Sequence, residues 1–350
     1  MIGVFDHPWL GGLFGDAEAS GIWSPSSQLG HMLAFEVALT QALGQSGVIT
    51  AETADTVAQL IAHFVPDIND LREGTARDGL PVPALVTQLR HAVGENAKAV
   101  HTGATSQDVI DTALALTLRD FNVILGERLD AIISALENMR QQYGTASLMG
   151  RTRMQAALPI TVSDRIDTWS QPLIGHLARL ERLGPQVTRL QLGGAVGDRA
   201  ALAPFADEIA ADMAARLGLG NPPKAWHAMR ENLADYANLL SLITGTLGKI
   251  GQDICLMAQQ GIDEIAMQSG GKSSAMPHKQ NPIQAELLVT LGRFNATQLS
   301  AMHHAMIHEQ ERSGTAWALE WMVLPQMAQA TARSLSAAIA MFSHISRIGT

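Results

Sequence analysis

Charged residues, aromatic residues and cysteine are all scarce in this sequence. Asp, Glu, Lys and Arg make up 16% of its 350 residues, and Phe, Trp and Tyr make up 5%. Charged residues alone usually account for about 25%. A chain with so few charges and 47% hydrophobic residues is expected to cover part of its surface in subunit interfaces. The shortage of aromatics, together with recurrent Ala, Leu, Met and Gln, favours helices over sheets.

Several classes of protein are excluded by what is missing. The one cysteine, Cys255, cannot form an internal disulfide, and its apolar neighbours predict a buried thiol that packs as a small hydrophobe. No run of 18 apolar residues occurs, so no membrane span is expected. The N-terminus lacks the basic and apolar segments of a signal peptide, so the expected location is cytoplasmic.

The charge balance restricts the partners. A formal net charge of −9 argues against nucleic acid and anionic membranes, because both attract basic patches. It does not exclude an anionic substrate, because local groups rather than the net charge make a binding site.

Long helices are predicted between residues 111 and 310. Between residues 111 and 143, apolar residues recur at steps of three and four, which predicts a helix of about 30 residues and about 45 Å. The ranges 164–190, 227–262 and 284–310 show the same spacing. Residues 1–107 contain shorter helices and more turns. The sequence therefore predicts an all-α protein with a smaller N-terminal helical domain at 1–107 and a central long-helix bundle domain at 108–350.

Four glycines lie inside these predicted helices, at Gly126, Gly245, Gly248 and Gly251. Each would cost about 1 kcal/mol relative to alanine in a helix. Close approach of neighbouring helices is the expected reason for keeping them.

The segment 268–282, QSGGKSSAMPHKQNP, has two adjacent glycines and two prolines and is predicted to be a loop. It carries hydroxyls at Ser273 and Ser274, the cation Lys279 and the amide Asn281. Lys279 is suited to neutralise a substrate carboxylate, and Asn281 to hydrogen-bond it. A solvated surface turn is the alternative that composition leaves open.

The segment 101–112, HTGATSQDVIDT, places Thr105 and Ser106 just before a predicted helix that Asp108 is expected to cap. A helix N-terminus offers free N–H groups and positive potential, which suit a carboxylate. A plain helix cap is the alternative.

A third segment, GRTRMQAALP at 150–159, contains Arg153, which is able to hold a carboxylate through two hydrogen bonds. A structural ion pair is the alternative. Two other patterns are weak: His304 and His308 have metal-ligand spacing on a predicted helix but lack HExxH, and QLGGAVGD lacks the GxGxxG spacing of dinucleotide sites. No metal and no organic cofactor are therefore expected.

The loop GGKSSAMPHKQNP resembles the signature of the fumarase/aspartase superfamily, a GSSxMPxKxNP pattern. The resemblance implies that Ser273 is the base that takes the proton α to a carboxylate, with Lys279 nearby to stabilise its alkoxide. HTGATSQDVIDTA resembles the first superfamily motif. It implies that Thr105 and Ser106 bind a substrate carboxylate and that His101 lines the site as a further catalytic candidate.

Within the superfamily, the form TSQD followed by DTA is most similar to the carboxymuconate cycloisomerases. Most superfamily lyases have GRTH where this sequence has Arg153, and that histidine helps to protonate the leaving group. Amines and hydroxide need such a proton, whereas a carboxylate, with a pKa of about 4, leaves unaided. Gln155 matches a family glutamine near the substrate. Segments 226–230 and 311–321 also resemble cycloisomerases, and Arg312 in the latter is expected to bind substrate.

The resemblance implies a homotetramer in which each active site collects residues from three chains, acting on a small-molecule tricarboxylate. The expected reaction is reversible lactonisation of 3-carboxy-cis,cis-muconate to 4-carboxymuconolactone. The alternatives are another superfamily lyase, such as an adenylosuccinate or argininosuccinate lyase, and a catalytically silent structural homologue. Many superfamily members carry a small C-terminal helical domain, which is expected to be short or absent because the chain ends at Thr350. Lys272, Asp198 and Ala318 depart from the family pattern.

Overall fold

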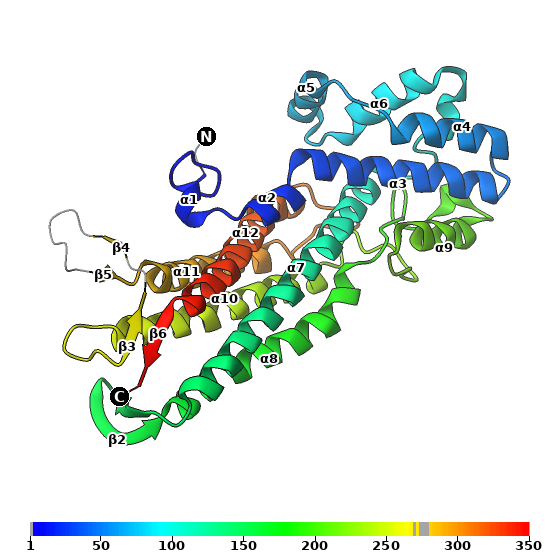
Figure 1. The fold of residues 1–350 in the computed structure, drawn as a ribbon. Helices are drawn as coiled ribbons and strands as arrows, with labels where there is room; N and C mark the ends of the chain where they lie inside the picture. The colour runs from blue at the N-terminus through cyan, green and yellow to red at the C-terminus, as the bar shows by residue number, and fades with distance from the viewer. Residues whose placement is uncertain (1–2, 269–270, 273–279, 350) are drawn as a thin grey trace.

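The computed structural model describes residues 3–268, 271–272 and 280–349. Its long helices lie alongside one another in an elongated bundle, and shorter helices cluster at one end (Figure 1). The helices are α1 (Gly11–Phe14), α2 (Ala17–Ile22), α3 (Pro25–Gln45), α4 (Ala51–Ala62), α5 (Ile68–Asp78), α6 (Val82–Val93), α7 (Ser106–Tyr143), α8 (Val162–Val187), α9 (Ala206–Leu217), α10 (Glu231–Met257), α11 (Ile283–His304) and α12 (Thr315–Ser343). The all-α prediction is confirmed.

The four predicted long helices correspond to α7, α8, α10 and α11. The predicted end of the last one, at residue 310, is wrong, because α11 ends at His304 and the chain then turns back towards α12. His304 and His308 therefore do not share a helix face. The His308 side chain is buried, with its Nε2 3.8 Å from Glu320 Oε1. Among the described residues, no three His, Cys, Asp or Glu side chains are grouped as metal ligands.

Two hydrophobic cores lie along the molecule. The larger one fills the bundle between α7, α8, α10, α11 and α12. The smaller one joins residues between Leu33 and Leu116 to residues between Leu190 and Leu219. Helix α9 thus packs on α3, on the side opposite α4 (Figure 1). The cluster at this end of the bundle is built from two separate stretches of the chain.

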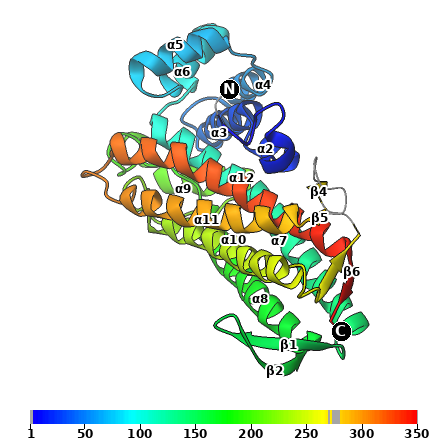
Figure 2. The same cartoon turned by 90° about the vertical axis from the view of Figure 1, so that its left-hand side faces the viewer.

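Short antiparallel strand pairs lie at the opposite end of the bundle (Figure 2). Strand β1 (Ser147–Thr152) pairs with β2 (Gln155–Thr161), which contains β-branched residues and Pro159. Strand β3 (Ile265–Met267) pairs with β6 (Ile345–Ile348), which fixes the end of the chain to the bundle. Strands β4 (Gly271–Lys272) and β5 (Gln280–Asn281) pair on either side of residues that the structure does not describe.

The helical glycines fall into two groups. A Cβ at Gly251 would lie 2.4 Å from the backbone oxygen of Ala285 on α11, and one at Gly248 would lie 3.2 Å from that of Leu288. Close helix approach is thus confirmed for these two. It is wrong for Gly126 and Gly245, since a Cβ there would meet nothing within 4 Å among the described residues.

Cys255 is only half-buried, so the expectation of a fully buried thiol is wrong. Burial still raises the pKa of its thiol to about 11, with a smaller contribution from Glu286. The thiol therefore stays protonated at neutral pH. As for membranes, none of the described helices combines the length and apolarity that crossing a bilayer requires.

The two groups of glycines predict opposite effects on stability. Gly251→Ala should lower the free energy of unfolding by about 1–3 kcal/mol, because the added methyl overlaps α11. Gly245→Ala, on the same helix, should raise it by up to about 1 kcal/mol through helix propensity. Urea unfolding followed by circular dichroism measures both, and equal effects of the two changes would contradict the assigned helix contact.

Candidate functional site

The first turn of α7 is the best-defined polar site in the described structure. Thr105 is the N-cap residue and Ser106 the first helical residue, and both are half-buried. As expected, Asp108 caps this helix. It is the third helical residue and completes a capping box, in which its carboxylate accepts the Thr105 N–H at 2.9 Å. The capping box leaves Thr105 and Ser106 at the N-terminal end of the helix, where the free backbone N–H groups favour an anion.

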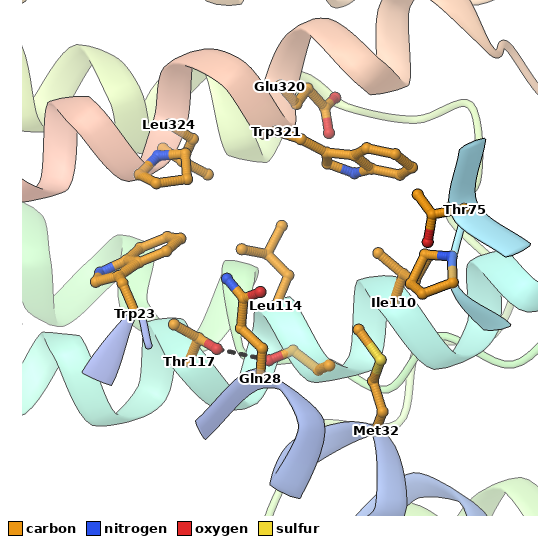
Figure 3. A pocket seen from close by; sticks show the side chains of 13 residues that line it. Trp23, Gln28, Met32, Thr75, Ile110, Leu114, Thr117, Glu320, Trp321 and Leu324 are labelled. Atoms are coloured by element: carbon orange, nitrogen blue, oxygen red, sulfur yellow. Dashed lines mark hydrogen bonds between the residues drawn. The ribbon is translucent and has the colours of Figure 1, made fainter. Parts of the chain in front are cut away.

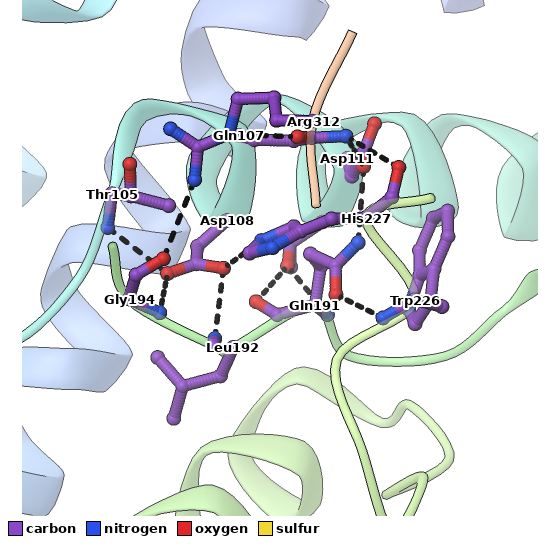
Figure 4. A network of polar contacts seen from close by, with 12 residues as sticks. Thr105, Gln107, Asp108, Asp111, Gln191, Leu192, Gly194, Trp226, His227 and Arg312 are labelled. Atoms are coloured by element: carbon purple, nitrogen blue, oxygen red, sulfur yellow. Dashed lines mark hydrogen bonds and ion pairs between the residues drawn. The ribbon is translucent and has the colours of Figure 1, made fainter. Parts of the chain in front are cut away.

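The Asp108 carboxylate is fully buried and accepts three further hydrogen bonds (Figure 4). The N–H groups of Gly193 and Gly194 donate at 2.9 Å each, and His227 Nε2 lies at 2.7 Å. Gly194 has a φ of 68°, and a Cβ there would lie 2.9 Å from the Gly103 oxygen. The glycine-rich segment predicted around residue 194 is therefore a tight turn that encloses this carboxylate. With four donors around it, Asp108 is a fixed structural anion.

Arg312 lies over the same helix turn. Its Nε donates to Gln107 Oε1 at 3.1 Å, and its Nη2 donates to the backbone oxygens of Gly194 and Ala195 at 3.3 and 3.2 Å. Gln107 in turn donates to the His227 backbone oxygen at 3.0 Å. The structure thus places the predicted substrate residues Thr105, Ser106 and Arg312 together, although Arg312 is about two hundred positions from the other two. We call this site, which combines hydroxyls, a helix N-terminus and a guanidinium, the α7 corner.

A second buried carboxylate, Asp111, anchors the next turn of α7. Arg230 donates to it at 2.7 and 3.1 Å, and to Glu320 at 2.9 and 2.5 Å. The indole nitrogen of Trp317 and the amide of Gln191 also donate to Asp111, each at 3.1 Å. Burial alone would lower the pKa of Arg230, but the two carboxylates outweigh it and raise that pKa above its ordinary value. Arg230 therefore remains charged.

His101 has a left-handed backbone, with a φ of 61°. Its Nδ1 lies 2.6 Å from Oε1 of Glu36, whose side chain is 1% exposed. A carboxylate accepts, so Nδ1 donates to Glu36 and the ring is held in one orientation. An open hollow of about 500 Å³ beside it is lined by Arg90, Ala97, Lys98 and Thr102, which adds two cations next to the α7 corner.

Arg153 and Gln155 lie at the opposite end of the bundle, in the β1–β2 hairpin, and both are exposed (Figure 2). Helix α7 has 38 residues and separates the two ends by about 57 Å. Arg153 and Met154 have φ values of 49° and 67°, a two-residue turn that usually takes Asn or Gly. Arg153 forms no ion pair with the residues described, whereas Arg151 in the same hairpin bonds Glu264 at 2.6 Å.

Asn281 is half-buried at the start of α11, towards the same end as this hairpin (Figure 1). Ser273 and Lys279 lie outside the described residues. The structure thus brings together His101, Thr105, Ser106 and Arg312 at one end of the helix bundle. It places Arg153, Gln155 and Asn281 towards the other end of the bundle.

Several residues of the polar network were not predicted from the sequence: Gln107, Asp111, Gln191, His227, Arg230 and Glu320. Segment 226–230 was noted only for its family resemblance. The sequence did hold one signal for these residues. Asp108 and Asp111 lie on the side of the predicted helix that faces the protein core, where a lone carboxylate is costly and requires partners.

The sequence is similar to a lyase family and to two enzymes of known name. A family model described as Lyase matches residues 16–297. The 3-carboxy-cis,cis-muconate cycloisomerase of Pseudomonas aeruginosa is 34% identical over 332 residues, which cover 93% of this chain and 72% of that protein. The N-acetyl-S-(2-succino)cysteine lyase of Enterococcus italicus is 33% identical over 328 residues, with the same coverage of 93% and 72%.

Solved structures agree with these relatives. The crystal structure of 3-carboxy-cis,cis-muconate lactonizing enzyme from Pseudomonas putida matches with a TM-score of 0.92 at 31% identity, covering 97% of this chain and 77% of that one. A fumarate lyase from Mesorhizobium matches with a TM-score of 0.89 at 30% identity, covering 96% of this chain and 76% of that one.

The buried ion cluster predicts a large effect of one substitution. Arg230→Met should lower the free energy of unfolding by about 3–5 kcal/mol, because Asp111 and Glu320 would remain buried without their cation. The surface pair Arg77–Asp78 provides the control, and Arg77→Met should leave the free energy of unfolding almost unchanged, because water screens an exposed ion pair. Urea denaturation of both variants measures the difference. A loss below 1 kcal/mol for Arg230→Met would show that the cluster is not an essential contact.

Proposed function

Because the chain belongs to the fumarase/aspartase superfamily of lyases, we propose that it catalyses the reversible lactonisation of 3-carboxy-cis,cis-muconate to 4-carboxymuconolactone. The observation that carries the proposal is the corner at the start of α7, where Thr105, Ser106 and Arg312 offer donors to a carboxylate. The P. aeruginosa relative and the P. putida structure bear the name of this activity. The substrate is a tricarboxylate, which matches a site rich in hydrogen-bond donors and cations.

The proposed chemistry assigns a role to each group. One substrate carboxylate adds to the conjugated diene and forms the lactone C–O bond, while negative charge develops on the enolate of another carboxylate. A proton then joins the α carbon. Lys279, Asn281 and the α7 corner stabilise the enolate, and Ser273 carries the proton. His101, held by Glu36 through Nδ1, lies four residues before Thr105 and is a further candidate for this site.

The separation of the predicted residues supports a site shared between chains. One chain carries the α7 corner at one end of the bundle and Arg153, Gln155 and Asn281 towards the other. A single copy therefore does not assemble the set. We infer that a homotetramer brings the two ends of different copies together, so that each site collects residues from three chains.

Arg153 bears on the choice of leaving group. In the reverse reaction the lactone expels a carboxylate, whose pKa of about 4 makes a proton donor unnecessary. Adenylosuccinate and argininosuccinate lyases expel nitrogen bases, so an arginine at this position disfavours them. Retention of Ser273, Lys279 and Asn281 disfavours a catalytically silent homologue.

A thioether substrate is the second candidate, favoured by the relative that acts on N-acetyl-S-(2-succino)cysteine. Such an elimination breaks a C–S bond, leaves fumarate and expels a thiolate. A thiol has a pKa of about 8.5, so its need for a proton donor lies between those of a carboxylate and an amine. Arg153 is compatible with both reactions, and direct assay separates them.

Ser273→Ala tests the proposed proton carrier. The wild-type protein should remove the ultraviolet absorbance of the carboxymuconate diene, and the variant should lose about a thousand-fold or more in kcat, because it lacks the proposed proton carrier. Ser26→Ala, which changes an exposed serine in the first turn of α3, is the matched control and should retain full turnover. Fumarate release from the thioether without diene loss would favour the second candidate.

Mixing two inactive variants tests the shared site. Arg312→Ala removes the α7 corner, and Asn281→Ala alters the other end, so each alone should lose most of its activity. Unfolding and refolding the two together should restore part of the turnover, because hybrid tetramers contain some sites made only of intact residues. Light scattering should report a tetramer throughout. A fully active monomer, or hybrid tetramers with no recovery, would contradict the shared site.

A further inference from the structure

A cavity of about 300 Å³ lies between α3, α7 and α12, beyond the first turn of α7 (Figure 3). Its walls are mainly apolar, with the two indole rings of Trp23 and Trp321 and the side chains of Met32, Leu114 and Leu324. Ligand sites are typically clefts of about 300–1,000 Å³ with apolar walls and a few polar groups. The size and lining therefore suit a small ring system.

The charge of the lining disfavours the proposed substrate itself. Glu320 is the one ionisable side chain among the lining residues, and its carboxylate is already paired with Arg230 behind the wall, so the wall offers no free cation. A tricarboxylate would leave water for an apolar space beside a carboxylate, which is costly. An uncharged group avoids that cost, so this cavity and the carboxylate corner differ in the chemistry they accept.

Two polar groups of the lining residues lack a hydrogen-bond partner among the described residues. The half-buried Gln28 amide makes no hydrogen bond to the residues described. Pro325 lies inside α12 and has no N–H, so the backbone oxygen of Trp321 lacks its helical donor. An aromatic ring that bears one N–H or O–H group would satisfy such an acceptor while its faces contact the indoles.

The cavity is connected to the α7 corner in two ways. Ile110, Leu114 and Thr117 line it from one face of α7, and Ser106 is on that same face one turn earlier. The ring of Trp321 packs edge-on against Trp317, with centroids 4.7 Å apart, and Trp317 donates to Asp111. A group in the cavity therefore lies next to the proposed carboxylate site and against the cluster that fixes it.

We propose that this cavity binds an uncharged one- or two-ring aromatic group with a single hydrogen-bond donor. The ring belongs either to a separate small molecule or to a substrate whose carboxylate is held at Ser106. Only the second source rests on the carboxylate-binding role proposed for the α7 corner, because the first needs no substrate carboxylate.

Titration with indole, which is uncharged and has one N–H, tests the site directly. Calorimetry on the wild-type protein should show saturable binding. Ala113→Phe places a ring into the cavity from α7 and should weaken binding by about ten-fold or more. Val123→Phe adds the same ring to an exposed face of α7, where the valine is 58% exposed, and should leave affinity unchanged. If Ala113→Phe does not fold, Gln28→Trp at the half-buried rim serves in its place.

Comparing phenylsuccinate with succinate separates the two sources. If the ring belongs to the substrate, phenylsuccinate should bind about ten-fold more tightly than succinate, and Ala113→Phe should abolish that gain. If the ring belongs to a separate molecule, the two dicarboxylates should bind alike while indole still binds. Absence of indole binding, or equal indole affinity in the wild-type and cavity variants, overturns the proposal. Neither result bears on the lactonisation assay.

Discussion

The enclosure of Asp108 by four donors is the constraint on which the site depends. A buried carboxylate without partners would be strongly destabilising, and here the start of α7, the turn at 193–194 and His227 each supply a hydrogen bond. The turn and His227 both lie more than eighty residues after the start of α7 along the chain. All three segments must therefore be in place together, and moving any one of them would leave the anion short of a donor.

The same constraint orients the groups expected to meet the substrate. Because the Asp108 carboxylate accepts the Thr105 N–H, the Thr105 and Ser106 hydroxyls are placed at the helix end. The turn that supplies the two N–H donors also presents its carbonyl oxygens to Arg312. A structural anion thus holds a corner whose remaining donors face outward, and the charge balance of the corner is suited to an anionic ligand.

Periodicity predicted four long helices because each buries a stripe of apolar residues at helical spacing, a property of neighbouring positions. The sequence did not reveal that α9 joins the core of residues 33–116, since that contact links positions far apart. Gly126 and Gly245 show the same limit, because a glycine alone does not indicate which helix, if any, approaches it. Thr105, Ser106 and Arg312 were predicted through family resemblance, whereas the carboxylates that hold them were not.

The hairpin of Arg153 strengthens the inference that sites are shared between copies. Two successive non-glycine residues with positive φ each cost about 1–3 kcal/mol, and such strain is concentrated at functional positions. Pairing of β1 with β2 offsets part of that cost, but within one chain nothing described uses the Arg153 side chain, which is exposed and forms no ion pair with the described residues. A hairpin held firmly at its base by Arg151 and Glu264 but strained at its tip is suited to present one guanidinium to a surface outside its own chain. The α7 corner of another copy, which already gathers donors for a carboxylate, is the partner that the proposed reaction requires, because the substrate has one carboxylate more than a dicarboxylate site would hold.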